Sequence, residues 1–269
     1  MDELKHRYDV LRKRGKTGML IIIIGIPFIL IPFIGFPIIL IGCSLLYKND
    51  KELKSLYKKI FVERALVRNF ENVIYDPNKG FSKEQVGSFK LCKMDNFFSS
   101  EDYISAVYNG IPFEVSDVKS KFAGENQDKT YFSGRMMIFN LSEKSISQLF
   151  LFSDSYKYRV DGEWLNDRYK VEFESVEFNK QYDVYSINAE EAFYFLTPAL
   201  MERFQKLSEK YKSMAMSVTG NRVILGFNEP NNNAFDSKLS SFGTDEEESQ
   251  KINEDIEDIK RLISAFLMN

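Results

Sequence analysis

An uncharged and largely apolar run, residues 18–47, constrains this chain more than any other feature of its sequence. A membrane-spanning helix needs about 20 apolar residues. The run has thirty residues, so it is long for one such helix and short for two. A cleavable signal peptide fits poorly, because its apolar region is about 7 to 15 residues long and ends in small residues. The run therefore predicts a membrane segment that either crosses once or turns back.

Basic residues stand on both sides of the run in equal number: Lys5, Arg7, Arg12, Lys13, Arg14 and Lys16 before it, and Lys48, Lys51, Lys54, Lys58, Lys59 and Arg64 after it. Basic flanks favour the cytoplasmic side of a membrane. A single span would force one cluster across, whereas a hairpin leaves both inside. Pro32, Gly35 and Pro37 would supply the hairpin turn, because proline breaks a helix and glycine accepts positive φ.

Each arm of such a hairpin has about 14 residues and is about 21 Å long at 1.5 Å per residue. This is less than the roughly 30 Å thickness of the hydrocarbon core. We therefore predict an N-terminal membrane helical hairpin over residues 18–47 that thins the bilayer or stops short of its far face. A single tilted, proline-kinked span is the alternative. Residues 1–17 before it are expected to form a basic cytoplasmic helix.

The scarcity of reactive residues argues against several kinds of chemistry. The two cysteines, Cys43 and Cys92, lack disulfide or metal-ligand spacing, which is typical of a reducing compartment. The stretch 40–43 resembles a bacterial lipobox, but the apolar run continues after Cys43, so a buried thiol is preferred over a lipidated one. The single histidine, His6, argues against His-dependent triads and metal sites. The net charge of −3 gives no reason to expect nucleic acid as a partner.

No phosphate-binding glycine loop, serine nucleophile elbow or metal-ligand spacing occurs in the sequence. Glu172 and Glu174 would share one face of a strand, but acids on the wet face of a strand are commoner than an acid–base pair. Glu190 and Glu191 stand at a helix start, where the helix dipole favours anions whatever the function. We therefore expect no catalytic residue, no cofactor and no metal.

The residues after the run predict a helix followed by a folded domain. Apolar residues recur at spacings of three and four over 51–70, which indicates a juxtamembrane helix over 48–72. Its basic face would lie on anionic headgroups, or simply in solvent. Over 73–228 short strands and turns prevail: Asn109-Gly110 and Gly220-Asn221 predict two β-hairpins. Further strands are expected over 130–140, 148–152, 156–160 and 168–174.

Two helix starts lie between these strands. Asn188 with Glu191 forms a capping box, and Thr197 caps a second helix with Pro198 at its first position, where the missing N–H costs nothing. Strands, then a helical pair, then strands again indicate an α+β domain with a mixed, mainly antiparallel sheet.

The last forty-one residues divide into a linker and a helix. Residues 229–243 are polar and too poor in apolar side chains to build a core. Residues 244–269 predict an acidic amphipathic helix, opened by a capping box of Thr244 and Glu247. Its apolar residues, Ile252, Ile256, Ile259, Ile263 and Phe266, form a heptad-like seam. We expect the seam to dock on the juxtamembrane helix, and the expected contacts join Leu53, Tyr57 and Ile60 to Ile256, Ile259 and Ile263. Oligomerisation through the seam, or a free amphipathic helix, is the alternative.

Several segments of the folded domain are distinctive: Glu174-Ser175-Val176-Glu177-Phe178, Tyr182-Asp183-Val184-Tyr185, Ala189-Glu190-Glu191-Ala192 and, most specific, residues 196–203. Tyr75-Asp76-Pro77, Asp102-Tyr103 and Phe132-Ser133-Gly134 add to them. On these motifs the chain resembles family 3137 of the domains of unknown function, bacterial membrane proteins of which some carry a galanin label. The resemblance spans residues 1 to about 228, and Phe193 departs from it where arginine is expected. It implies the same architecture and carries over no activity, substrate or catalytic residue.

These observations predict a protein anchored in the cell membrane, with the bulk of the chain in the cytoplasm, that acts as a non-catalytic binding or scaffold module. Its expected partners are the lipid bilayer and other membrane or cytoplasmic proteins. A membrane-associated hydrolase that uses neither histidine nor metal is the alternative. A deep pocket lined by charged groups would favour the hydrolase, and a shallow groove or open sheet edge would favour the binding module.

Overall fold

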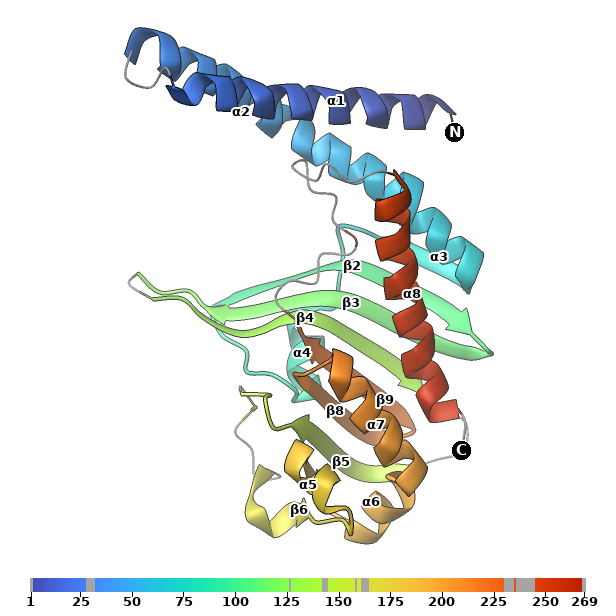
Figure 1. Cartoon of the computed structure of the whole chain (residues 1–269). Helices are drawn as coiled ribbons and strands as arrows, with labels where there is room; N and C mark the ends of the chain where they lie inside the picture. The colour runs from blue at the N-terminus through green and yellow to red at the C-terminus, as the bar shows by residue number, and fades with distance from the viewer. Residues whose placement is uncertain are drawn as a thin grey trace. The chain divides into compact units, whose positions relative to one another are not determined.

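A computed structural model of the chain describes residues 2–27, 32–125, 127–141, 145–157, 159–160, 165–229, 235 and 245–267. Two compact units make up the fold. The helical unit comprises Met1–Asn69 with Asn233–Asp258, and the sheet unit comprises Phe70–Asn232 with Ile259–Asn269. Figure 1 traces the chain by colour through both units.

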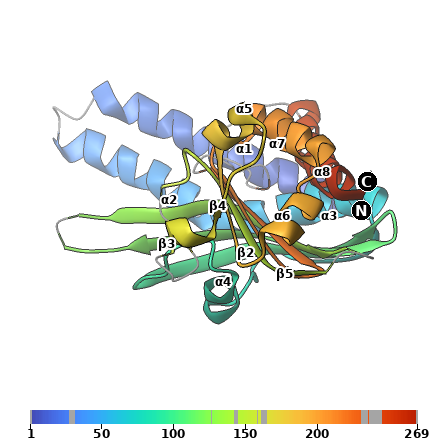
Figure 2. The same ribbon diagram turned by 90° about the horizontal axis from the view of Figure 1, so that it is seen from below.

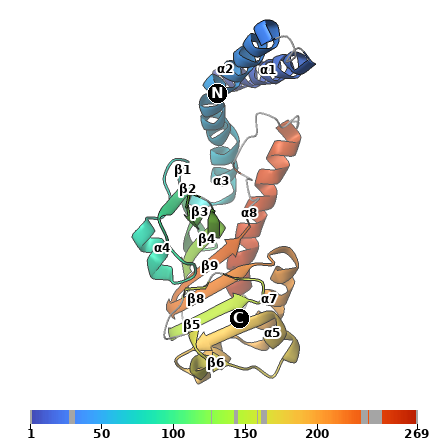
Figure 3. The ribbon, with the colours of Figure 1, turned by 90° about the vertical axis from the view of Figure 1, so that its left-hand side faces the viewer.

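The helical unit is built on an antiparallel pair of helices, α1 (Asp2–Gly25) and α2 (Pro32–Tyr57), which lie side by side in Figures 1 and 3. A π-helical turn, η2 (Lys58–Val62), and α3 (Glu63–Asn69) continue α2. A Cβ atom on Gly42 would lie 2.6 Å from the Ile22 side chain and 2.8 Å from the carbonyl oxygen of Gly18. Glycine at position 42 therefore lets the two backbones approach closely.

The turn between α1 and α2 does not lie where the prolines predicted it. Pro32 begins α2, and Gly35 and Pro37 stand inside that helix, so the predicted turn at these three residues is wrong. Proline at the first helical position loses no intrahelical N–H bond, and Pro37 removes only one. The reversal falls between Gly25 and Pro32, and residues 28–31 within it lie outside the described residues.

Within the described ranges, no helix is both long enough and apolar enough to cross a bilayer. Charged residues of α1 extend to Lys16, and α2 carries Lys48, Asp50 and Lys51 in its second half. The uncharged run is therefore divided between two helices that are each partly charged.

Aromatic packing joins α1 to the helical segment that follows the run. The ring of Tyr8 lies 6.3 Å from that of Tyr57 and 5.4 Å from that of Phe61, and the last two are 5.3 Å apart. An ion pair between Arg7 and Glu52 adds a polar contact. The residues of the helix predicted over 48–72 form the end of α2, then η2 and then α3. A strand begins directly after α3.

The sheet unit contains a nine-stranded sheet in the described residues, with the order β1-β2-β3-β4-β9-β8-β5-β7-β6. All pairs are antiparallel. The strands are β1 (Glu71–Asp76), β2 (Phe97–Tyr108), β3 (Ile111–Phe122), β4 (Lys129–Asn140), β5 (Ile146–Ser153), β6 (Lys170–Val171), β7 (Tyr182–Ser186), β8 (Met214–Gly220) and β9 (Arg222–Asn228). The predicted α+β class with a mainly antiparallel sheet is confirmed.

Both predicted hairpins are present. Asn109 and Gly110 have φ angles of 49° and 77° and join β2 to β3, as a type I′ turn requires. Gly220, with φ of 62°, turns β8 into β9. The strands expected over 130–140 and 148–152 form as β4 and β5.

Two expected strands are wrong or much shorter. The strand over 168–174 shrinks to β6, because a 3₁₀ turn, η4 (Asp167–Tyr169), precedes it. The Asn179 side chain then binds both the N–H and the carbonyl of Phe173, so these groups cannot continue the ladder. The described residues of 156–160 are not in a strand.

The sheet is covered on both faces, as Figures 2 and 3 show. The short helix α4 (Lys83–Phe89) and the chain after it pack on one face, where Phe89 and Leu91 join Phe132 and Phe152 in one core cluster. The other face carries α5 (Val176–Gln181), α6 (Ala189–Phe195), α7 (Pro198–Lys210) and the last turns of α8 (Asp245–Leu267). Burial on both faces explains why the central strands contain continuous apolar runs, such as residues 136–139 of β4, 149–152 of β5 and 223–225 of β9.

The predicted helix caps of the pair α6 and α7 are confirmed. The Asn188 side chain accepts the N–H groups of Glu190 and Glu191 at 3.1 and 3.4 Å, and it donates to the Glu191 carboxylate. The hydroxyl of Thr197 accepts the N–H of Leu200, and Pro198 is the first residue of α7.

The predicted linker and terminal cap fall mostly outside the described residues. Thr244 is among these, and so is all of 229–243 except residues 229 and 235. Phe235 is only 1% exposed, so the expectation that this stretch contributes nothing to the core is wrong.

Candidate functional site

A polar cluster forms in the sheet unit at a bulge of β2. One extra residue stands on β2 between the pairs Glu101–Asp117 and Ile104–Val115. Asp102 lies within this bulge with φ of 56°, a conformation that few non-glycine residues adopt, and it is 3% exposed. A bulge re-aims the side chains around it, and here it turns an acidic residue into the protein.

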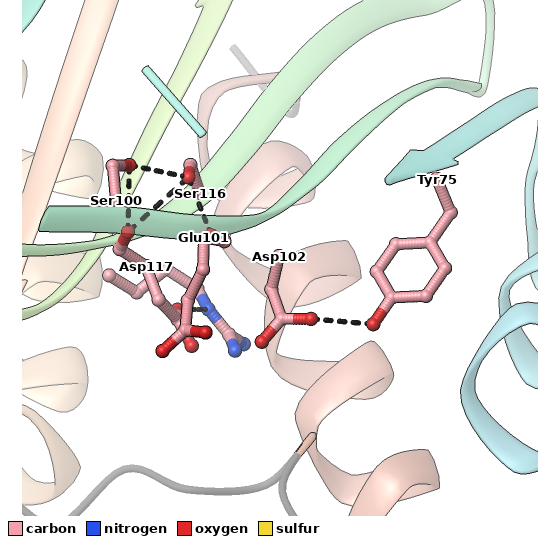
Figure 4. A network of polar contacts seen from close by, with 7 residues as sticks. Tyr75, Ser100, Glu101, Asp102, Ser116 and Asp117 are labelled. Carbon is pink, nitrogen blue, oxygen red and sulfur yellow. Dashed lines mark hydrogen bonds and ion pairs between the residues drawn. The ribbon is translucent and has the colours of Figure 1, made fainter. Parts of the chain in front are cut away.

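The turn after β1 closes over the bulge. The hydroxyl of Tyr75 donates to Asp102 Oδ1 at 2.5 Å (Figure 4), and the N–H of Tyr103 donates to the carbonyl of Lys79 at 3.0 Å. A Cβ atom on Gly80 would overlap Ser100, so only glycine fits against the strand here. These contacts tie β1 and its turn to the bulged strand.

Two serines and an ion pair complete the cluster (Figure 4). The Ser116 hydroxyl donates to the carbonyl of Glu101 at 2.7 Å, and the Ser100 hydroxyl donates to the carbonyl of Asp117 at 2.8 Å. On β4, Arg135 Nε donates to Asp117 Oδ1 at 2.9 Å, and Arg135 is 6% exposed. The serine protons thus go to backbone carbonyls and the buried charge has a partner. The arrangement supports a bulge and contains no pair of nucleophile and base.

Sequence reasoning noticed parts of this cluster without joining them. Tyr75 and Asp102 each lie in a segment that supports the family resemblance, but they are 27 residues apart and nothing local predicts their hydrogen bond. A third segment of the resemblance, Phe132-Ser133-Gly134, contains Gly134, where a Cβ atom would lie 2.0 Å from the carbonyl oxygen of Phe227. All three segments therefore fix how β1, β2, β4 and β9 approach one another.

The other acidic candidates have structural surroundings. Glu172 and Glu174 lie beyond the end of β6, so the prediction that they share a strand face is wrong. Glu191 accepts the N–H and hydroxyl of Ser147, and these bonds lower the pKa of its carboxyl group. Among the described residues, no group of acids, histidines and cysteines could hold a metal ion.

An ion-pair network stands at the β6 end of the sheet. Asp183 Oδ2 lies 2.7 Å from Arg159 Nη1, and its Oδ1 lies 3.0 Å from Lys170 Nζ. Burial alone would raise the pKa of Asp183, but the hydrogen bonds from Arg159 and Lys170 hold it below its ordinary value. The carboxylate of Asp183 is therefore engaged in ion pairs with Arg159 and Lys170.

The cysteines occupy opposite surroundings. Burial raises the pKa of the Cys92 thiol to about 12, so it stays protonated and unreactive. Cys43 in α2 is exposed on the surface of the chain, and its expected burial in lipid stays a prediction.

The residues predicted to mediate helix docking are divided between the two units. Leu53, Tyr57 and Ile60 are buried in the helical unit, and so is Ile256 of α8. Ile60 and Ile252 line one pocket there. Ile259 and Ile263 belong to the sheet unit, where Phe266 of the same seam packs on Phe139, Phe195 and Phe204. The docking of Ile256 on Leu53 and Tyr57 stays a prediction.

Exposed apolar side chains gather on the α1–α2 pair. Among the side chains that the structure describes here, six are more than half exposed: Leu20, Ile23 and Ile24 of α1, Ile26 just after it, and Leu40 and Ile41 of α2. Because glycine mediates the close contact between the two helices, large side chains are left on the outside. Such a patch marks an interaction site on most proteins.

Comparison with known proteins places the chain in a family. The profile described as "Protein of unknown function (DUF3137)" matches residues 130–267, just over half of the 269 residues. The chain belongs to this family. The match begins at β4 and includes α8, whereas the resemblance was expected over residues 1 to about 228. No curated protein matches the sequence.

One solved structure resembles this fold at a distance. It is the crystal structure of the mycobacterial trehalose monomycolate transport factor A, TtfA, with a TM-score of 0.41 and 9% sequence identity. The similarity covers 76% of this chain and 95% of that one.

Proposed function

We propose that the protein is a membrane-anchored binding module, whose α1–α2 pair enters a bilayer and holds the sheet unit at the cytoplasmic face. The exposed apolar side chains of that pair carry the proposal. Leu20, Ile23 and Ile24 of α1 and Leu40 and Ile41 of α2 are 51 to 57% exposed. Full burial of such a side chain is worth about 1.5–3 kcal/mol, so half of that for each residue sums to roughly 4–7 kcal/mol.

Lengths and charges support entry from one side. The uncharged end of α1, residues 17–25, is about 14 Å long at 1.5 Å per residue, well short of the roughly 30 Å hydrocarbon core. The two helices are antiparallel, so the basic residues before and after the uncharged run emerge at the same end of the pair. Basic clusters favour the cytoplasmic side and anionic headgroups. We infer that the pair stops within the bilayer.

The sheet unit supplies the binding part of the proposal. β1 is an edge strand with β2 as its paired neighbour, and its Ile74 is 63% exposed. An open edge with an exposed apolar side chain suits an extended segment of a partner protein, which would add a strand. The hydrolase alternative has no comparable support, because the hydroxyls of Ser100 and Ser116 are used by backbone carbonyls.

Flotation with lipid vesicles tests the anchor. The full chain should float with vesicles of phosphatidylglycerol and phosphatidylcholine, and the double variant Ile23→Glu/Ile24→Glu should stay in the dense fraction. Val67→Glu and Ile74→Glu are matched controls, because these residues are equally exposed at 60% and 63% and lie outside the pair. Equal flotation of the double variant and the wild type would refute the proposal.

A further inference from the structure

A small pocket of about 210 Å³ lies within the helical unit. Three cationic side chains line it, Lys5 of α1 and Arg64 and Arg68 of α3, and none of the lining residues that the structure describes is acidic. Ser249 and Asn253 of α8 add a hydroxyl and a carboxamide to the lining. The lining thus combines positive charge with neutral hydrogen-bonding groups, which is the chemistry that binds an anion.

The two arginines act as a pair. Arg64 and Arg68 are four residues apart, so they lie on the same face of α3, where like charges destabilise a helix. Both are exposed, and neither has an ion pair or side-chain hydrogen bond with the rest of the described chain. A bound anion would relieve this repulsion. Guanidinium groups also match the geometry of phosphate oxygens, which they bind in bidentate fashion.

The π-helical turn η2 shapes the pocket wall. Ile60 and Phe61 of this turn line the pocket, and π-helical turns are frequent at functional sites. Phe61 is held by its ring contacts with Tyr8 and Tyr57. Phe61, Arg64 and Arg68 then recur at spacings of three and four, so one continuous face presents an apolar surface beside two cations.

We propose that this pocket binds the phosphate group of a small soluble molecule, with Arg64, Arg68 and Lys5 as its cationic ligands. An apolar part of the ligand would lie against Ile60 and Phe61, and against Ile252 of α8. Pockets for drug-sized ligands are typically about 300–1,000 Å³. The smaller volume here suits a compact phosphate ester.

The position of Lys5 along α1 favours a soluble ligand over a lipid headgroup. This inference rests on the proposed membrane anchor. Lys5 precedes Gly18 by 13 residues on one continuous helix, about 20 Å at 1.5 Å per residue. Lys13, Arg14 and Lys16 stand next to the uncharged end and would meet the headgroups first. The pocket lies further from the bilayer, within reach of the aqueous phase.

Titration with phenyl phosphate tests the proposal. Ligand-observed ³¹P NMR with the full chain at low ionic strength gives the dissociation constant of phenyl phosphate. Inorganic phosphate, which lacks an apolar part, is titrated in the same way for comparison. Phenyl phosphate should bind more tightly than inorganic phosphate. The double variant Arg64→Gln/Arg68→Gln should weaken binding at least tenfold, because hydrogen bonds to charged groups are lost. Lys59→Gln is the matched control, since Lys59 is an exposed cation of η2 outside the lining.

A second variant fills the pocket without changing its charge. Ala65→Phe adds a ring beside Arg64 and Arg68 and should also abolish binding of phenyl phosphate. Absence of phenyl phosphate binding to the wild type, or equal binding to the double arginine variant, would overturn the proposal. Arginine-dependent binding of phosphatidylglycerol vesicles without binding of phenyl phosphate would overturn the soluble ligand and assign a lipid headgroup. The membrane anchor is tested separately, by vesicle flotation of the Ile23→Glu/Ile24→Glu variant. Failure of the anchor proposal is therefore distinguishable from failure of the phosphate-binding proposal.

Discussion

Phe266 near the end of α8 should contribute more to the stability of the sheet unit than any exposed residue beside it. Its ring centroid lies 5.2 Å from that of Phe139, 5.8 Å from Phe204 and 6.4 Å from Phe195, and the residue is 6% exposed. Phe266→Ala removes three ring contacts and leaves a cavity between β4, α6 and α7. Substitutions of this kind cost about 3–5 kcal/mol.

Such a loss is large against a total stability of about 5–15 kcal/mol. With a urea m-value of about 2 kcal/mol/M, a loss of about 4 kcal/mol lowers the unfolding midpoint by about 2 M. The assay is urea unfolding of the full chain, followed by circular dichroism at 222 nm. Leu267→Ala is the control, because Leu267 is adjacent and 36% exposed. A midpoint shift for Phe266→Ala no larger than that of Leu267→Ala would refute the reasoning.

Two further changes test the close strand approach and the ion-pair network. Gly134→Ala places a Cβ atom 2.0 Å from the carbonyl oxygen of Phe227, so β4 and β9 must separate, at a cost of about 1–3 kcal/mol in urea unfolding. Gly87→Ala, whose Cβ atom would meet nothing closer than 3.8 Å, should be neutral or stabilising, and equal effects would contradict the argument. The pKa of Asp183 is lowered in the folded state, so its stabilisation is full above the unfolded pKa and is lost as pH falls through the folded one. Asp183→Asn should therefore flatten the pH dependence of the unfolding midpoint below about pH 4, and an unchanged slope there would count against the network.

Local chemistry made parts of the fold predictable. Asn188 and Thr197 cap helices through side-chain bonds to residues two or three positions away, and Asn109-Gly110 suits one turn type. Each signal lies within four residues and needs no knowledge of the rest of the chain. Ser82 is a similar cap that sequence reasoning missed: its hydroxyl accepts the N–H of Gln85 and begins the short helix α4.

Non-local contacts account for what could not be predicted. The hairpin turn was placed on the prolines, although proline is well tolerated where Pro32 stands, at the first position of a helix. The bulge of the polar cluster depends on partners far apart in sequence, such as Tyr75 with Asp102 and Arg135 with Asp117. The pocket likewise joins Lys5 to Ser249, and no periodicity connects residues so distant.

The strand order has a consequence for how the protein is made. β4 and β5 are neighbours in sequence, but the β8–β9 hairpin separates them in the sheet. A ribosome that has released residues up to β7 therefore carries two incomplete sheets, with the backbone edges of β4 and β5 both unpaired. Such edges are templates for aggregation. Residues 214–228 close the gap late in synthesis, so the nascent chain should depend on chaperones until they emerge and should aggregate when translation is truncated between β7 and β8.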